Sequence, residues 1–344
     1  MSSYLYMQPI LNLELSDTVH GELLVDDVLI ISSARLTRVR NRVGFPKRIS
    51  ESGNWIREAV DKYHCFGIVT VASSSESALK KAETKIRDAC FALRCANWPF
   101  QKRSTSNLLR VFGPADVAYG VRSTQLVVNT DTGVLKGSRS MWRRSLLTLR
   151  LDTDWHRFQK EHGILKKMNT FFQEGTQIEP EWRNAVRRAA ILFGRSLQDA
   201  DRAFAFLLDM IALDTLLLAK RDRAIEMFPR LDAVLGWSNL GRKKPWFENS
   251  DLRRLSLLRN SLVHNGDANG LQAGDLLLAD ALLGNVLSCV LRMGRKWGSR
   301  DSMIEFGNRV SCRVSLGQRP YASEGKLPFK VLLPKHSPAE LADL

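Results

Sequence analysis

The segment from Arg259 to His264, which reads RNSLVH, brings together side chains that can act on a phosphodiester. A histidine takes up and releases a proton near neutral pH, which suits it to general acid or base catalysis. An arginine donates hydrogen bonds to phosphate oxygens and neutralises the charge that develops on them. The first hypothesis is therefore a phosphate-handling site at Arg259 and His264.

An arginine followed within a few residues by a histidine is weak support by itself, because the chain is rich in arginine. The pattern recurs in three other pairs: Arg57 with His64, Arg150 with His156, and Arg157 with His162. The segment at Arg259 differs from them in two ways. A polar residue, Asn260, follows its arginine directly, whereas an acidic or apolar residue follows in the other pairs. It also ends a capped amphipathic helix in the helical part of the chain.

The expected helix begins at the capping sequence Asn249-Ser250-Asp251 and stops at Asn265-Gly266. Within it, Asn260 and His264 are four residues apart and share a face. Arg259 projects about 140° away from His264, at ~100° per residue, but its long side chain can reach the same phosphate.

A second signature lies on the apolar helix expected before this one. The stretch from Ile211 to Leu217, IALDTLL, resembles the Ala-Leu-Glu-x-Leu-Leu signature of Apea-like HEPN domains. The segment from Asn184 to Arg195 resembles the helix that precedes that signature. HEPN ribonucleases also carry an arginine, four to six residues and a histidine, usually with a polar residue after the arginine. The resemblance covers about residues 180–300 and departs at Asp214, where the family usually has glutamate.

The resemblance implies a metal-independent endoribonuclease without a cofactor. RNA carries its own nucleophile, the 2′-hydroxyl, and its in-line attack leaves a 2′,3′-cyclic phosphate and a 5′-hydroxyl. His264 would be the general base or acid, and Arg259 would neutralise the phosphorane oxygens. Asn260 would orient the phosphate or the histidine, and Asp214 would position Arg259 or His264.

The family also implies partners. HEPN domains usually pair and bring two such motifs into one basic cleft, which implies a homodimer. Proteins that resemble this chain are commonly found in anti-phage defence or toxin systems. Abortive-infection RNA cleavage, restrained until a phage-derived or partner-protein trigger arrives, is the expected role.

Two other classes of function stay open. A HEPN-like bundle can be a non-catalytic scaffold that binds RNA or a partner protein. In that case His264 is a surface or capping residue, and Asp214 is a satisfied core carboxylate. A DNA-binding regulator is disfavoured because no helix-turn-helix signature stands out.

The net charge of +15 over 344 residues favours a polyanionic partner, nucleic acid before an acidic membrane surface. The candidate RNA-backbone contacts outside the site are basic residues: Arg35, Arg38, Arg40, Arg42, Lys47, Arg48, Arg253 and Arg254. Arg38, Arg40 and Arg42 alternate as one face of a strand would. Solvated strand and helix faces explain the same residues as well.

The pattern of strands and helices predicts an α+β domain over residues 1–150, of unknown role in sensing or RNA contact. Strands are expected at 23–25, 28–31, 66–71 and 124–128, with a helix from Ser74 through Leu93. Residues 151–300 predict an all-α HEPN-type helical bundle with helices at 152–173, 179–195, 199–223, 249–264 and 275–296. Residues 301–344 predict an irregular basic tail, with a short strand around 329–333.

The remaining features favour a cytoplasmic protein. The five scattered cysteines include no metal-binding spacing, which fits free thiols in a reducing compartment. The N-terminus lacks the pattern of a signal peptide. The longest apolar candidate for a membrane span, 203–219, is interrupted by Asp209 and Asp214, so no membrane partner is expected.

Overall fold

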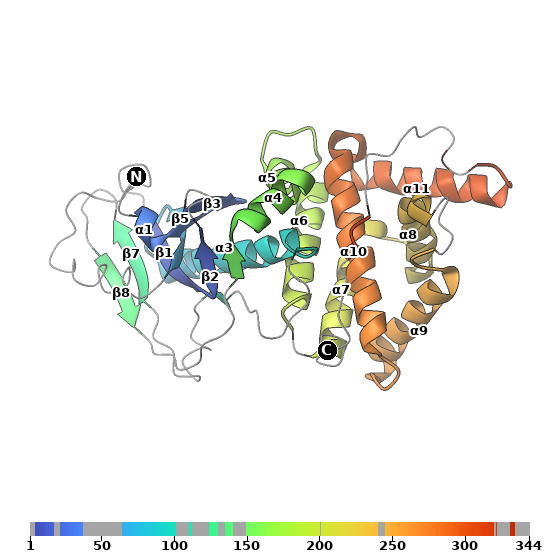
Figure 1. The fold of residues 1–344 in the computed structure, drawn as a ribbon, viewed down its shortest axis with the longest axis horizontal. Coiled ribbons are helices and arrows are strands. Elements are labelled where there is room, and N and C mark those ends of the chain that lie inside the picture. Colours follow the sequence, from blue (N-terminus) through green and yellow to red (C-terminus); the bar gives the residue numbers. More distant parts are fainter. Residues whose placement is uncertain are drawn as a thin grey trace. The chain divides into compact units, whose positions relative to one another are not determined.

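A computed structural model describes residues 4–16, 21–36, 64–100, 110–111, 124–129, 135–139, 149–199, 201–239, 245–319, 321 and 331–333. The chain divides into two compact units (Figure 1). The first comprises Met1–Leu93 and Ser106–Leu165, and the second comprises Arg94–Thr105 and Lys166–Leu344. The division therefore differs from the expected boundary at residue 150, and it assigns residues 94–105 to the helical unit.

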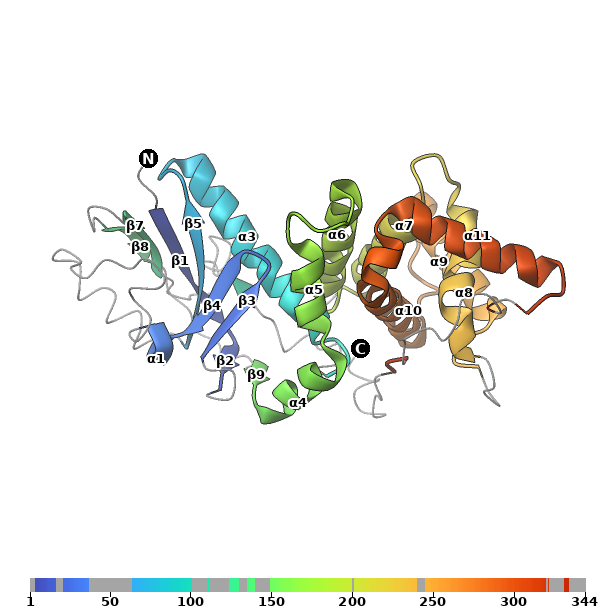
Figure 2. The same cartoon turned by 90° about the horizontal axis from the view of Figure 1, so that it is seen from above.

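The first unit contains an antiparallel sheet in the order β3-β4-β5-β1-β7-β8, with β6 also paired to β1 (Figures 1 and 2). Its strands are β1 (Tyr4–Leu11), β3 (Glu22–Val25), β4 (Val28–Ser32), β5 (Cys65–Val71), β6 (Arg110–Val111), β7 (Thr124–Asn129) and β8 (Leu135–Arg139). The prediction of an α+β part followed by a helical part is confirmed at this level. Strand β1 was not among the predicted strands, although Met7 lies between Ile68 of β5 and Leu126 of β7 in the sheet.

Helices and a small second sheet complete the first unit. Helix α3 (Glu76–Ala96) covers β5, because a Cβ atom at Gly67 would lie 2.5 Å from the side chain of Ile86. Strand β2 (Leu13–Leu15) pairs in parallel with β9 (Leu149–Leu151). The predicted continuous helix over 152–173 is wrong. Gly163, at φ +61°, separates α4 (Thr153–His162) from α5 (Ile164–Phe172), and most of α5 belongs to the second unit.

The candidate RNA surface near residue 40 is described only at its edge. Arg35 lies in the short helix α1 (Ser33–Leu36), and its side chain is half-buried. The remaining members of that run, Arg38, Arg40, Arg42, Lys47 and Arg48, lie outside the described residues.

The second unit is a helical bundle around α10 (Figure 2). Its helices are α6 (Pro180–Ser196), α7 (Arg202–Leu217), α8 (Met227–Leu235), α9 (Asn249–Asn265), α10 (Ala273–Met293) and α11 (Arg300–Ser315), with 3-10 turns η3 (Ala224–Glu226), η4 (Gly236–Asn239) and η5 (Gly294–Trp297). Pro180 starts α6 at its first turn, as expected. Trp98 fixes the packing of α10, since a Cβ atom at Gly284 would lie 2.4 Å from its ring.

The prediction of an irregular tail from residue 301 is wrong for its first part, because α11 runs from Arg300 to Ser315. Its side chains Met303, Phe306 and Val310 are buried at helical spacing. The Ser299 hydroxyl accepts a hydrogen bond from the Ser302 N–H at 3.1 Å and caps the helix. Residues 331–333 have no regular structure, and the rest of the expected strand at 329–333 lies outside the described residues.

A buried asparagine holds a distant part of the chain against α10. The Asn285 amide donates to the Leu332 carbonyl oxygen at 2.9 Å, and its oxygen accepts from the Leu332 N–H at 2.9 Å. A third bond goes to the Ala281 carbonyl oxygen at 2.7 Å. Asn285 is fully buried and Leu332 nearly so, so one side chain replaces a strand partner for this segment.

Among the described residues, the helix with the composition of a membrane span is not the rejected candidate at 203–219. The stretch Ala273–Trp297, formed by α10 and η5, is long and apolar enough, but most of it is buried inside the bundle. Such burial fits the core helix of a soluble protein.

Candidate active site

Helix α9 positions Arg259, Asn260 and His264, and both of its ends are fixed. At its start, the Glu248 N–H donates to the Asp251 side chain at 2.8 Å, so the cap lies one residue before the expected one. At its end, Gly266 has φ +66° and its N–H bonds to the Leu262 carbonyl at 3.1 Å. A glycine suits this left-handed position, and the stop at Asn265-Gly266 is confirmed.

The acidic partner comes from α7, whose first turn is capped by the Asp201 side chain. The Arg259 Nη2 atom lies 2.6 Å from the Asp214 Oδ2 atom. Both side chains are largely buried, with 19% of Arg259 and 23% of Asp214 exposed. A carboxylate this close fixes the guanidinium and offsets its loss of hydration.

The second oxygen of the Asp214 carboxylate takes no part in this ion pair. The Asp214 Oδ1 atom is buried and accepts no hydrogen bond from the described residues. A buried carboxylate oxygen without a donor costs free energy, which a donor that reaches it would offset. The pair therefore has bonding capacity beyond the α7–α9 contact.

Asn260 and His264 lie on the exposed side of α9. The Arg259 Nη1 atom approaches the Asn260 Oδ1 atom at 3.5 Å, a weak contact. Among the described residues, no hydrogen bond or ion pair joins His264 to Arg259 or Asp214. The structure thus brings Arg259, Asp214 and Asn260 together, with His264 one turn further along and open to solvent.

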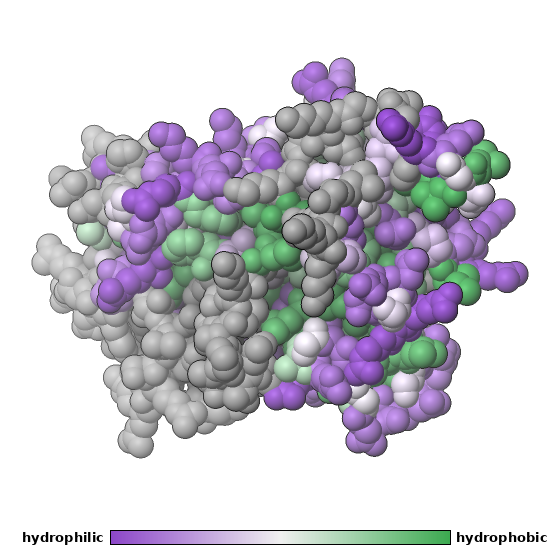
Figure 3. Space-filling model, turned by 45° about the vertical axis from the view of Figure 1, so that its right-hand side comes forward, coloured by the Kyte–Doolittle hydropathy of each residue, from purple (hydrophilic) through white to green (hydrophobic). Residues whose placement is uncertain are grey.

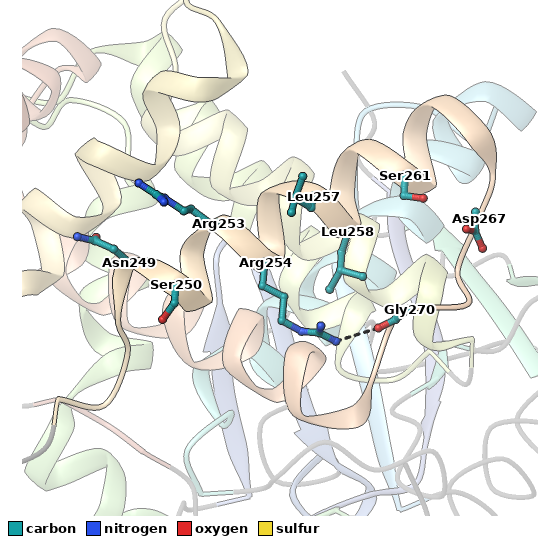
Figure 4. A pocket seen from close by; sticks show the side chains of 9 residues that line it. All are labelled: Asn249, Ser250, Arg253, Arg254, Leu257, Leu258, Ser261, Asp267 and Gly270. Carbon is teal, nitrogen blue, oxygen red and sulfur yellow. Dashed lines mark hydrogen bonds between the residues drawn. The ribbon is translucent and has the colours of Figure 1, made fainter.

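The neighbouring arginines have different surroundings (Figure 4). Arg254 donates to both oxygens of Asp275, at 2.6 and 2.7 Å, and to the Gly270 carbonyl at 2.9 Å. Burial opposes ionisation of Asp275, but the bonds from Arg254 and the Gln272 N–H outweigh it and hold the pKa of Asp275 below its usual range. Arg254 thus ties α9 to the start of α10, which argues for a structural role over RNA contact.

Arg253 points away from Arg254 and is exposed (Figure 4). Both arginines line a hollow of about 750 Å³ along α9, together with Ser250, Ser261 and Asp267. Arg253 makes no hydrogen bond or ion pair with the described residues. Of the two candidate RNA contacts on this helix, it is the one whose guanidinium is available.

No metal site is seen in the described part of the chain: it has no cluster of three or more His, Cys, Asp or Glu side chains that could hold an ion. Cys65, Cys90, Cys95 and Cys289 are buried free thiols, and Cys312 is exposed. Burial raises the pKa of Cys95 and of Cys289 to about 12, which keeps both thiols protonated.

Comparison of the chain with protein-family models, with curated proteins and with solved structures finds no match.

Proposed function

We propose that the protein is a metal-independent endoribonuclease of the HEPN type that cleaves RNA by attack of the 2′-hydroxyl. The observation that carries the proposal is the half-buried ion pair between Arg259 and Asp214, which fixes a guanidinium one turn before the exposed His264. A fixed cation beside a solvent-accessible acid–base group is the arrangement that metal-free phosphodiester cleavage needs. The net charge of +15 supports a polyanionic substrate.

The proposed roles of Arg259 and His264 follow from the different environments of the two side chains. Asp214 holds Arg259 through one terminal nitrogen, so other guanidinium donors stay available to phosphate oxygens. His264 is exposed on the last turn of α9, where an RNA strand can approach it and Asn260 together. Arg259 would stabilise the phosphorane while His264 moves the proton of the 2′-hydroxyl or of the leaving 5′-oxygen.

The direct test is incubation of the purified full chain with RNA in the presence of EDTA. We expect cleavage products that carry 2′,3′-cyclic phosphate and 5′-hydroxyl ends, since the nucleophile belongs to the RNA. A matched DNA strand, which lacks the 2′-hydroxyl, should stay intact. Binding of RNA without any cleavage would favour the alternative, a non-catalytic HEPN-like scaffold for RNA or protein.

A homodimer through the bundle is part of the proposal. Two large apolar side chains are exposed one turn from the ion pair: Ile211 on α7, at 49%, and Val263 on α9, at 53%. Exposed apolar residues on both helices beside the site favour coverage by a second copy. Pairing would also bring two copies of His264 and Arg259 to one cleft, which helps because the two side chains diverge by about 140° within a single helix.

The dimer makes a prediction. Ile211→Glu or Val263→Glu should convert the protein to a monomer in light scattering and lower RNA cleavage by about tenfold or more, because a buried charge without a partner is costly. Leu257→Glu is the matched control, because Leu257 is exposed on α9 but not on the face of the ion pair. If all three variants keep the oligomeric state of the wild type, this interface is wrong.

We further propose that the enzyme acts in the cytoplasm, in anti-phage defence or a toxin system. Cleavage restrained until a phage-derived or partner-protein trigger arrives would fit a half-buried arginine that is already engaged by Asp214. Expression of the wild type against a His264 variant in bacteria exposed to phage tests this role. Equal phage yields in both cultures would contradict the proposed role in anti-phage defence.

A further inference from the structure

A groove of about 770 Å³ lies between α8, α9 and α11 in the second unit. Each helix contributes apolar side chains: Phe228 and Ala233 from α8, Leu252 and Leu257 from α9, Val310 and Val314 from α11. Sites for small molecules typically have volumes of about 300–1,000 Å³ and mostly apolar walls with a few polar groups. The size and lining of this groove match that description.

The rim extends the apolar surface. Ile225, Leu257 and Val314 are 73%, 70% and 56% exposed, and all three line the groove. Figure 3 shows apolar side chains gathered in patches between hydrophilic ones on the surface of the molecule. A ligand with an apolar body would remove part of this surface from water.

The polar groups of the groove indicate which charge a bound ligand would carry. The Asp232 carboxylate on α8 lines the groove and has no hydrogen-bond or ion-pair partner among the described residues. The Tyr321 hydroxyl does not serve it, since it donates to the Ala233 carbonyl oxygen at 3.0 Å. Burial raises the pKa of Asp232, as expected for a carboxyl that has lost water and gained no cation.

We propose that this groove binds an apolar molecule that carries one ammonium group, with the ammonium against Asp232. A carboxylate among apolar side chains costs free energy until a cation pairs with it, and the ligand would supply that cation. Among the described residues that line the groove, the only cation is Arg253, which is exposed on α9. The inference stands on the groove alone and does not depend on ribonuclease activity.

Three probes of equal chain length test the proposal: decylammonium, decanol and decanoate. They are titrated calorimetrically into the full chain, the two ions below their micelle concentrations and decanol below its solubility limit. We expect decylammonium to bind about 10- to 100-fold more tightly than decanol, the range for a charge-assisted hydrogen bond. Decanoate should bind most weakly. Non-specific attraction to a protein of net charge +15 would give the opposite order, with decanoate ahead of decylammonium.

Substitutions distinguish the contribution of the Asp232 charge to binding from that of the shape of the groove. Asp232→Asn should remove the preference for decylammonium and leave decanol binding nearly unchanged. Asp301→Asn, which removes an exposed carboxylate of α11 outside the groove, should bind like the wild type. Ser256→Trp should fill the groove and abolish binding of all three probes.

The proposal fails if the wild type binds none of the probes, if it does not favour decylammonium, or if Asp232→Asn binds decylammonium as the wild type does. Should Asp232→Asn not fold, equal decylammonium binding by the wild type and Ser256→Trp would also overturn it. RNA cleavage, measured in parallel on the Asp232 variant, should match the wild type. A loss of both cleavage and binding in a folded Asp232 variant would contradict the separation of the two sites.

Discussion

Replacing His264 by alanine is expected to lower the rate of RNA cleavage by about 10²–10⁴-fold, the usual contribution of a general acid or base. The fold should survive, because His264 is exposed on the last turn of α9 and Gly266 ends the helix without it. Single-turnover cleavage of a labelled RNA with EDTA present gives the rate, and thermal unfolding followed by circular dichroism checks the fold.

His156 offers a matched control for this experiment. It is an exposed histidine on α4, and Arg150 precedes it at a similar spacing. His156→Ala should cleave at the wild-type rate. Equal rates for wild type, His156→Ala and His264→Ala would end the assignment of His264 as the acid–base group and favour the scaffold alternative.

Replacing Arg259 by alanine is expected to reduce cleavage by about 10²–10³-fold, because the variant loses the donors that stabilise the phosphorane oxygens. Arg259→Lys should recover only part of the rate, since an ammonium cannot reproduce the planar fork. Asp214→Asn should have a smaller effect, about tenfold, because its role is to position Arg259. The effects of Arg259→Ala and Asp214→Asn in one chain should not add, since the two side chains are in contact.

The second interhelical ion pair of α9 separates catalysis from stability. Arg254 bonds to Asp275 as closely as Arg259 bonds to Asp214, at 2.6 Å in both cases. Arg254→Ala should therefore lower the unfolding temperature while the folded protein cleaves at close to the wild-type rate. If Arg254→Ala and Arg259→Ala lose activity in the same proportion, the role of Arg259 is structural.

The local signals in the sequence predicted the site helices well. Capping residues and helical spacing of apolar side chains placed α6, α9 and α10 to within a few residues, whereas α7 ends at Leu217, well before the predicted end at residue 223. The stop of α9 at Gly266 follows from the ability of glycine to adopt a positive φ, a property of the residue itself. The same local reasoning was wrong at Gly163, where a left-handed residue divides α4 from α5.

Contacts between helices that are distant in the sequence could not be predicted from such local signals. The sequence predicted Asp214 on an apolar helix and Arg259 on a separate amphipathic helix. Their contact, however, depends on how α7 and α9 cross. Helix α11 was missed because glycine and basic residues dominate its surroundings, although Met303, Phe306 and Val310 carry its apolar face. The groove at Asp232 is formed by three helices, so no single stretch of the sequence contains its signal.

The hydrogen bonds between Asn285 and Leu332 have a consequence for local unfolding of the protein. Leu332 has both main-chain groups bonded to a side chain 47 residues away in the sequence, inside the most buried helix of the bundle. The described residues 331–333 form no strand or helix, so their release would leave the buried Asn285 amide without two of its hydrogen bonds. Residues 331–333 should therefore separate from α10 in a single step that also disturbs the core, and Leu332 behaves thermodynamically as part of the bundle interior.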